Sequence, residues 1–158
     1  MNWSAIPTAV RHQPFPHMSN LNDSLGHCAH QEGKRRRQTM LNGRPVLIVE
    51  EEFLIALDLQ RMLEGLGCGQ TLFARNPGEA ELLRPHWPDL ALAVVEQRLD
   101  DPGTRSLPES LAEAGVALVL TTGDLSLSNA ARTAPLLIKP VPEEALTSAV
   151  RQALAARS

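Results

Sequence analysis

The sequence predicts an α/β fold, in which a parallel sheet is covered by helices on both faces. Five short apolar runs are bounded by polar or turn residues, as is typical of strands buried on both sides. Segments with helical apolar spacing or capping signals separate most of these runs. Strand and helix therefore alternate along the chain, which is the pattern of a doubly covered parallel sheet.

The first strand is expected at Pro45–Val49, where P-V-L-I-V runs directly into three acids, Glu50 to Glu52. A helix follows, because apolar residues recur at the spacing of one helical face, and G-L-G at Gly65–Gly67 ends it. The second strand is expected at Thr71–Ala74. The apolar face of the helix consists of Ile55, Leu59, Met62, Leu63 and Leu66.

A second helix is expected after Asn76, whose side chain can cap it, with Pro77 at its first position. It should end before Pro85. The third strand is expected at Leu90–Glu96, an apolar run that stops on an acid. The apolar residues expected inside the second helix are Ala80, Leu82 and Leu83.

The second half of the chain has weaker signals. A loop rich in Asp, Pro and Gly precedes a modest helix expected at Ser110–Ala114, and the fourth strand is expected at Val116–Thr122. Asp124–Arg132 is too short and polar to predict a helix, and Pro135–Ile138 is expected to form the fifth strand. A last helix should begin at Pro142. Its apolar face would consist of Leu146, Ala149, Val150, Ala153 and Leu154.

Charge divides the chain into two unequal parts. The net charge is −3, but the first 44 residues hold six Lys or Arg against two acids, and the remainder holds nine against sixteen. We therefore expect residues 1–44 to be a disordered basic tail and residues 45–155 to be one domain. His27–His30 and Lys34–Arg37 are interpreted as solvated segments of that tail. A second hypothesis is that the protein starts at Met40.

Composition excludes several classes of protein. No apolar run approaches the roughly 20 residues that cross a bilayer, and the N-terminus lacks the pattern of a signal peptide, which is a basic region followed by an apolar core and a cleavage site. The two cysteines, Cys28 and Cys68, have no second pair with which to make a disulfide or metal framework, which fits a reducing compartment. We expect a cytoplasmic protein that does not associate with membranes.

Polar residues gather where the expected strands end. In parallel sheets of this type, ligands bind at the carboxyl ends of the strands, where the strand order reverses. Taken singly, an acid or a lysine at a strand end is most often a solvated loop residue. Complementary charges from several strands favour a functional site instead. The strand ends supply Glu50, Glu51, Glu96, Thr121, Thr122 and Lys139.

The motifs V-L-I-V-E-E-E, P-D-L-A-L-A-V-V-E, L-T-T-G and I-K-P, in this order and spacing, resemble the receiver domain of two-component response regulators. The resemblance covers about residues 45–155. It implies a (βα)5 flavodoxin-like fold with strand order 2-1-3-4-5. It also implies an acidic Mg²⁺ pocket, a phosphoacceptor aspartate, a Thr or Ser that reads the phosphate, and a lysine before a cis proline.

The resemblance assigns a role to each residue at the strand ends. The metal-holding positions fall on Glu50 and Glu51, the hydroxyl on Thr122, the lysine on Lys139, the cis proline on Pro140 and the phosphoacceptor on Glu96. A glutamate in place of aspartate moves the acceptor carboxylate by about 1 to 1.5 Å, which in-line phosphoryl transfer tolerates poorly. We therefore expect slow or absent phosphorylation. Glu96 would instead imitate a phosphorylated aspartate, although incompletely.

Other departures from the family pattern also predict a site that works poorly as a phosphorylation site. Glu51 stands where the family generally has Asp, so Mg²⁺, which requires near-ideal octahedral geometry, should bind weakly if it binds. Arg98, two positions after the acceptor, could reach the acids and replace the cation. Leu136 stands where many receivers have an aromatic residue that responds to phosphorylation, so that response should be weakened.

Two functional hypotheses follow. The first is a stand-alone, non-enzymatic receiver without a DNA-binding domain, whose partner would be a histidine kinase, a phosphotransfer protein or a regulator protein. The second is a phosphate-independent interaction scaffold with the receiver fold. A flavin- or nucleotide-binding protein is disfavoured, because three acids follow the first strand where a glycine-rich phosphate loop would be needed. The sequence specifies neither the partner nor the oligomeric state.

Overall fold

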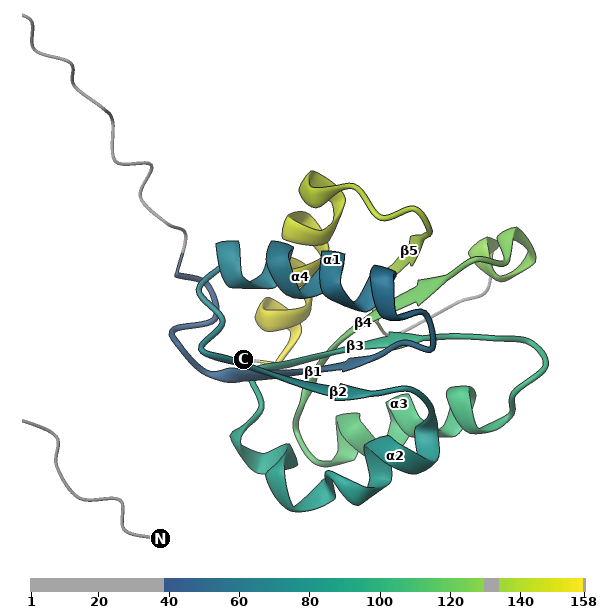
Figure 1. The fold of residues 1–158 in the computed structure, drawn as a ribbon, viewed down its shortest axis with the longest axis horizontal. Coiled ribbons are helices and arrows are strands. Elements are labelled where there is room, and N and C mark those ends of the chain that lie inside the picture. Colours follow the sequence, from purple (N-terminus) through teal and green to yellow (C-terminus); the bar gives the residue numbers. More distant parts are fainter. Residues whose placement is uncertain (1–38, 130–133, 158) are drawn as a thin grey trace, which may run out of the picture. The chain divides into compact units, whose positions relative to one another are not determined.

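A five-stranded parallel sheet lies between two layers of helices in the computed structural model, which describes residues 39–129 and 134–157 (Figure 1). The strand order is β2-β1-β3-β4-β5, and every neighbouring pair is parallel. The predicted fold class and strand order are therefore confirmed. The expected basic tail up to residue 38, including Cys28, His27–His30 and Lys34–Arg37, lies outside the described residues.

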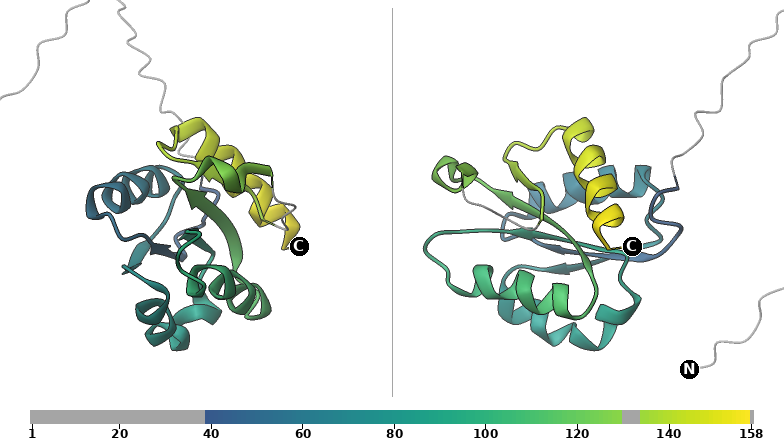
Figure 2. Two further views of the ribbon diagram at one scale, coloured as in Figure 1. Left: turned by 90° about the vertical axis from the view of Figure 1, so that its right-hand side faces the viewer. Right: turned by 180° about the vertical axis from the view of Figure 1, so that it is seen from behind.

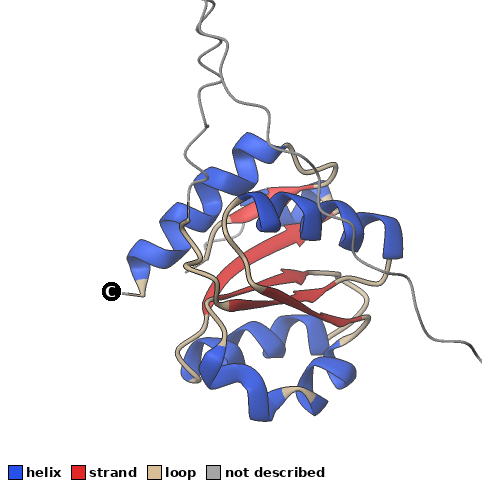
Figure 3. Cartoon of the chain, turned by 60° about the vertical axis from the view of Figure 1, so that its left-hand side comes forward, coloured by secondary structure: helices blue, strands red, loops and turns tan. Residues whose placement is uncertain are grey.

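The helices divide evenly between the two faces of the sheet, with α1 and α4 on one side and α2 and α3 on the other (Figures 2 and 3). The strands are β1 (Pro45–Val49), β2 (Gln70–Ala74), β3 (Leu92–Glu96), β4 (Ala117–Thr122) and β5 (Leu136–Ile138). The α-helices are α1 (Phe53–Gly65), α2 (Pro77–Leu82), α3 (Gly103–Glu113) and α4 (Glu143–Ala156). Two 3₁₀ segments complete the described elements, η1 (Arg84–Asp89) and η2 (Leu125–Asn129).

Each face of the sheet has its own core, because successive strand residues point to opposite sides. Val46 and Ile48 of β1 pack under α1 and α4, whereas Leu47 packs on the side of α2 and α3. All three are fully buried. The unbroken apolar runs at β1 and β3 reflect this double burial, which contributes roughly 1.5 to 3 kcal/mol per large side chain. The central strands are thus rigid supports for the residues at their ends.

The packed region extends beyond the expected limits of 45 and 155. Leu41 is only 1% exposed and packs in the core under α1. Its N–H donates to the carbonyl of Leu66 at 3.2 Å, and the N–H of Gly43 donates to the carbonyl of Gly67 at 2.8 Å. At the other end, the guanidinium of Arg157 donates to the carbonyl of Leu90 at 3.2 Å. Leu41, Gly43 and Arg157, which lie outside the expected limits, therefore belong to the fold.

The burial of Leu41 can be tested directly. Leu41→Ala is expected to lower the free energy of unfolding by about 2 to 3 kcal/mol, because it leaves a cavity in a closely packed core. Leu54→Ala is the matched control, since Leu54 is 78% exposed and should change stability by less than about 0.5 kcal/mol. Urea denaturation of both variants measures the difference. Equal, small effects would contradict the packing of Leu41.

Helix α3 differs from its prediction. The sequence suggested a helix only at Ser110–Ala114, but α3 begins at Gly103. Pro108 inside the helix has no N–H to donate to the carbonyl of Thr104. The side chain of Gln97 compensates, because its Nε2 donates to that same carbonyl at 3.3 Å. A tertiary contact thus supports a helix whose local sequence does not predict it.

The segment between β2 and β3 agrees with the prediction only in part. Asn76 caps α2 as expected, accepting a hydrogen bond from the N–H of Glu79 at 2.9 Å, but Leu82 is 80% exposed rather than part of the core. The 3₁₀ segment η1 follows α2 and buries Trp87, which the sequence prediction missed.

Within residues 39–129 and 134–157, no helix is long and apolar enough to span a membrane.

Candidate functional site

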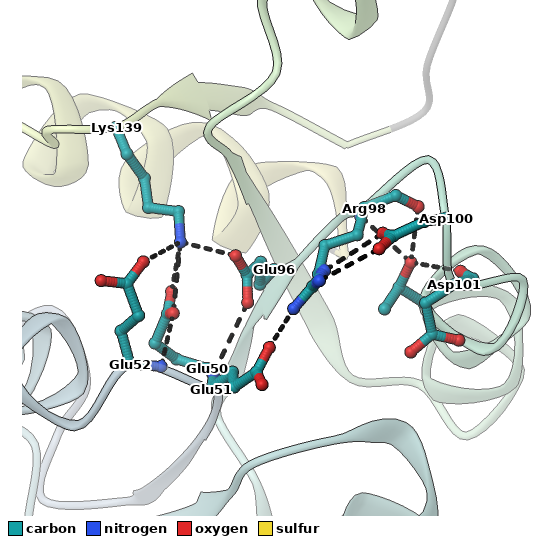
Figure 4. Close-up of polar contacts among 9 residues, drawn as sticks. Glu50, Glu51, Glu52, Glu96, Arg98, Asp100, Asp101 and Lys139 are labelled. Carbon is teal, nitrogen blue, oxygen red and sulfur yellow. Dashed lines mark hydrogen bonds and ion pairs between the residues drawn. The ribbon is translucent and has the colours of Figure 1, made fainter.

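Side chains from three strand ends meet at the carboxyl edge of the sheet (Figure 4). Glu50 directly follows β1, Glu96 is the last residue of β3, and Lys139 directly follows β5. Because all strands are parallel, their carboxyl ends lie at one edge, and the apolar runs before these residues fix the position of each end. The predicted convergence of acids and a lysine is therefore present.

Lys139 is the centre of this cluster. Its Nζ lies 2.6 Å from Oε1 of Glu96, and 3.2 and 3.0 Å from Oε1 and Oε2 of Glu50. The exposed fraction of the side chain is 10% for Lys139, 13% for Glu96 and 1% for Glu50. The carboxylate of Glu52 lies 3.9 Å away and is exposed. Two sheltered carboxylates thus share one ammonium group.

Backbone groups hold the cluster in place. The N–H of Glu52 donates to Oε1 of Glu50 at 3.0 Å, and the N–H of Glu51 makes a longer contact of 3.5 Å with Oε2 of Glu96. The N–H of Lys139 donates to the carbonyl of Thr122 at 2.8 Å, which ties the lysine to β4. The peptide bond between Lys139 and Pro140 is cis, as the resemblance implied.

The cluster shifts the pKa values of Glu50 and Lys139. Burial raises the pKa of the Glu50 carboxyl above its ordinary value of 4.5, against the lowering effect of the hydrogen bonds from Glu52 and Lys139. Burial alone would lower the pKa of Lys139, but its hydrogen bonds to Glu96 and Glu50 raise the pKa above its ordinary value of 10.5. Lys139 is therefore charged at neutral pH and holds the two acids together.

Arg98 forms a second group of charges beside the first. Its guanidinium binds the carboxylate of Glu51 and also pairs with Asp100, with Nη2 to Oδ2 at 3.1 Å and Nε to Oδ1 at 3.2 Å. The pKa of Arg98 is raised above its ordinary value. The main cause is the hydrogen bond and charge of Asp100, and the charge of Glu51 adds to it. Arg98 thus reaches one of the acids, as the sequence suggested.

A pocket of about 450 Å³ opens next to both groups. Its wall includes Glu51, Glu96 and Arg98, and on the other side the connection between β2 and α2. The pocket lies beside β1 and β3, where the strand order reverses, which is the position expected of a site in this type of fold. The residues lining it are Val49, Glu51, Arg75, Asn76, Pro77, Glu96, Arg98, Asp101 and Thr104.

Thr122, to which the resemblance assigns the phosphate-reading hydroxyl, makes its hydrogen bonds outside the lysine–carboxylate cluster. The side chain is fully buried. Its Oγ1 donates to the carbonyl of Gln97 at 2.9 Å and accepts from the N–H of Asp124 at 3.1 Å. The hydroxyl therefore braces the loops after β3 and β4, and its hydrogen bonds do not go to the lysine–carboxylate cluster.

Three polar residues that follow Arg98 in the chain were missed by the sequence analysis. Asp100 pairs with Arg98, and Thr104 accepts a hydrogen bond from the N–H of Arg98 at 3.1 Å. Asp101 lines the pocket and accepts from the N–H of Gly103 at 2.9 Å. The i, i+2 spacing of Arg98 and Asp100 was a usable signal, whereas the position of Thr104 depends on the unexpected start of α3.

A second hollow, the α1 groove, adjoins the opposite side of the cluster. It measures about 600 Å³ and runs between α1 and the segment that follows β5. Its lining consists of Leu54, Ile55, Asp58, Leu59, Met62, Lys139, Pro140 and Val141. Phe53 and Leu54, in the first turn of α1, are 70% and 78% exposed. Lys139 therefore belongs both to the buried cluster and to an apolar surface groove.

The donor set does not fit the Mg²⁺ ion that the receiver resemblance implies. Mg²⁺ needs short, near-octahedral contacts to free oxygen ligands. Here Glu50 and Glu96 are bound to Lys139, and Glu51 is bound to Arg98. Among the described residues, no three Asp, Glu, His or Cys side chains are grouped so that they could hold a metal ion. The protein's own cations already occupy these carboxylates.

Comparisons with known proteins agree with the fold. The sequence matches no protein-family model and no curated protein. Solved structures do match. A signal receiver domain of an HD domain-containing protein from Pseudomonas fluorescens Pf-5 is 26% identical with a TM-score of 0.60, over 73% of this chain and 90% of that chain.

Two further solved structures give the same result. A response regulator receiver protein from Sinorhizobium medicae WSM419 is 22% identical with a TM-score of 0.60, over 75% of this chain and 99% of that one. A response regulator receiver domain protein from Clostridium thermocellum is 18% identical with a TM-score of 0.60, over 71% and 94%. Nearly the whole length of these receiver proteins is thus matched.

Proposed function

We propose that this domain, a receiver domain by its fold, acts in two-component signal transduction by binding a partner protein, without itself accepting a phosphoryl group. The observation that carries the proposal is the contact of 2.6 Å between Oε1 of Glu96 and Nζ of Lys139. The side chain at the acceptor position is thereby already paired with the lysine that, by family resemblance, would pair with a phosphate.

The chemistry of Glu96 supports this reading. A nucleophilic carboxylate needs a free oxygen aligned with the incoming phosphorus, and misplacement by about 1 Å costs on the order of 100-fold in rate. Oε1 of Glu96 is bound to Lys139, and Oε2 is 3.5 Å from the N–H of Glu51. As a substitute for phosphate, the carboxylate supplies one charge and two oxygens rather than nearly two charges and three oxygens. Glu96 is therefore a partial imitation of the phosphorylated state.

The proposed binding surface is the α1 groove together with the exposed first turn of α1. Phe53 and Leu54 are adjacent large apolar residues that are exposed, and exposed apolar surface of this kind often marks a protein interface. An apolar groove beside a helix suits an amphipathic helix of a partner. We propose as partner a helical histidine kinase, phosphotransfer protein or regulator protein. Such a partner would contact Lys139, so its affinity would depend on the state of the charge cluster.

A second candidate function is an interaction scaffold that makes no use of Glu96. The orientation of Thr122 favours it, because the hydroxyl expected to read a phosphate is bound to Gln97 and Asp124 instead. In addition, the side chain of Leu136 has no ring to change position in response to a phosphate. The two candidates differ in whether partner binding depends on the charge of Glu96.

Incubation with Mg²⁺ and acetyl phosphate is expected to give no covalent product. Intact-mass spectrometry should show no gain of one phosphoryl group, since Glu96 is too long and already paired. A receiver domain with an aspartate acceptor, treated in parallel, is the positive control for the reagent. Stoichiometric labelling at Glu96 would contradict the proposal.

Leu54→Glu is expected to weaken partner binding by at least about tenfold, because it places a charge at the edge of the apolar groove. Leu82→Glu is the matched control, since Leu82 is equally exposed at 80% but belongs to α2 on the other face of the sheet. Both variants should be tested against the histidine kinases and phosphotransfer proteins of the source organism by biolayer interferometry. Equal affinities of the two variants would exclude the α1 groove as the binding surface.

A further inference from the structure

We infer that two copies of this chain form a dimer through β2, whose outer edges pair antiparallel about a two-fold axis. The β2 edge is the side of Gln70–Ala74 that faces away from β1 (Figure 1). A dimer of this kind leaves the α1 groove free, because that groove lies on the other side of α1, toward the segment that follows β5. It neither requires nor prevents the binding of a signalling partner.

The two edges of the sheet differ in their protection against pairing with another chain. The edge strand β5 has only three residues, Pro135 directly precedes it, and Pro140 follows two positions after its end. Short edge strands and prolines of this kind resist strand addition. By contrast, β2 has five residues and contains neither proline nor a charged side chain. Among the described residues it pairs only with β1, so its outer edge lacks the usual protection.

The main-chain groups of Thr71 and Phe73 point to the β2 edge. The N–H of Glu50 donates to the carbonyl of Ala74 at 3.0 Å, so Ala74 directs its carbonyl toward β1. Successive residues of a strand alternate in the direction of their main-chain groups. Phe73 and Thr71 therefore direct their N–H and C=O groups away from β1, where a further strand can bind them.

This edge is self-complementary. If Leu72 of each copy lies at the two-fold axis, Thr71 of one copy faces Phe73 of the other, and the reverse holds on the other side of the axis. The residues of each such pair exchange both of their main-chain hydrogen bonds. An aromatic side chain opposite a β-branched one is also a favourable cross-strand pair. Because a two-fold interface requires a surface that matches itself, a second copy is the partner that this edge fits.

Exposed apolar side chains lie on the same side of the molecule. Phe73 is 43% exposed and points to the α1 face of the sheet, since its neighbours Leu72 and Ala74 pack on the side of α2 and α3. Phe53 and Leu57 are also exposed, and their i, i+4 spacing places them on the flank of α1 away from the α1 groove. That flank is the one toward β2. Pairing of two β2 strands would shelter part of this apolar surface.

The test is sedimentation equilibrium of the full chain, which should show a dimer that forms as the concentration rises. Phe73→Lys is expected to raise the dissociation constant at least about tenfold, because it places two lysines near the axis. Thr71→Pro removes an outward N–H without removing a hydrogen bond to β1, and it should have the same effect. Leu125→Lys is the matched control, since Leu125 is exposed but belongs to η2, and it should dimerise like wild type.

Amide hydrogen exchange, followed by nuclear magnetic resonance, locates the interface. As the concentration of wild-type protein rises, exchange at the amides of Thr71 and Phe73 should slow more than exchange at Leu72, whose N–H points to β1. Circular dichroism establishes that each variant is folded. A wild-type protein that stays monomeric at all concentrations would overturn the inference. So would a dimer whose dissociation constant is unchanged in both folded Phe73→Lys and folded Thr71→Pro.

Discussion

Lys139→Met is expected to lower the free energy of unfolding by about 3 to 5 kcal/mol at neutral pH. The substitution keeps the apolar stem of the side chain but removes the ammonium between Glu50 and Glu96. Glu50 has a side chain only 1% exposed, so its charge would be left buried without a cation, held only by the N–H of Glu52. Breaking a sheltered ion pair from one side is costly for this reason. Urea denaturation measures the loss.

The loss of stability in Lys139→Met should increase as the pH rises. Burial already raises the pKa of Glu50 above 4.5, so the folded protein holds a proton more tightly than the unfolded chain. The stability from this group is present below pH 4.5 and is lost as the pH rises through the folded-state pKa. Removal of Lys139 takes away a group that lowers the pKa of Glu50. The variant should therefore lose more stability than wild type as the pH rises above 4.5.

A triple variant separates the charge effect from loss of packing. Adding Glu50→Gln and Glu96→Gln to Lys139→Met removes all three charges, and replacement of a complete ion pair is often nearly neutral. The triple variant should recover most of the lost stability, and its remaining pH dependence should be weaker. A loss below about 1 kcal/mol in Lys139→Met, or no recovery in the triple variant, would show that the three residues are not coupled as described.

The strands and the charged cluster could be predicted because both depend on short-range patterns. An apolar run buried on both faces of a sheet has no polar alternation, so its end is marked by the first charged residue. At β1 and β3 that residue is Glu50 and Glu96, and both lie at the predicted place. The same pattern located Lys139 after β5. Arg98 could be placed near the acids because it lies two residues beyond Glu96.

The features that were missed depend on contacts between distant residues. The start of α3 at Gly103 is supported by Gln97, whose side chain satisfies the carbonyl that Pro108 leaves without a donor. The direction of the Thr122 hydroxyl is set by a carbonyl 25 positions earlier in the chain, and strand alternation gives no information about it. The burial of Leu41 was missed because the domain limit was placed at the change in net charge near Arg44. Net charge does not mark the limit of a core.

Glu96→Gln is expected to weaken binding of the signalling partner by about tenfold if the charge of Glu96 is part of the signal. Glutamine keeps the length and shape of the side chain but replaces a charge-assisted hydrogen bond of 2.6 Å to Lys139 with a weaker one. Lys139 also lines the α1 groove, so a less tightly held lysine presents a different surface to the partner. A coupling of this kind between two sites is typically worth 5- to 150-fold, or about 1 to 3 kcal/mol.

The same variant decides between the two candidate functions. Glu81→Gln is the matched control. Glu81 lies on α2, on the other face of the sheet from the α1 groove, and its carboxylate is a surface group that pairs with Arg84. The affinities of wild type, Glu96→Gln and Glu81→Gln for one partner should be compared by calorimetry, after circular dichroism has shown all three to be folded. If Glu96→Gln binds like the control while Leu54→Glu does not, the groove binds the partner but Glu96 does not influence it. The domain would then be a phosphate-independent scaffold, and the pairing of Glu96 with Lys139 would serve only to hold β3 and β5 together at the edge of the sheet.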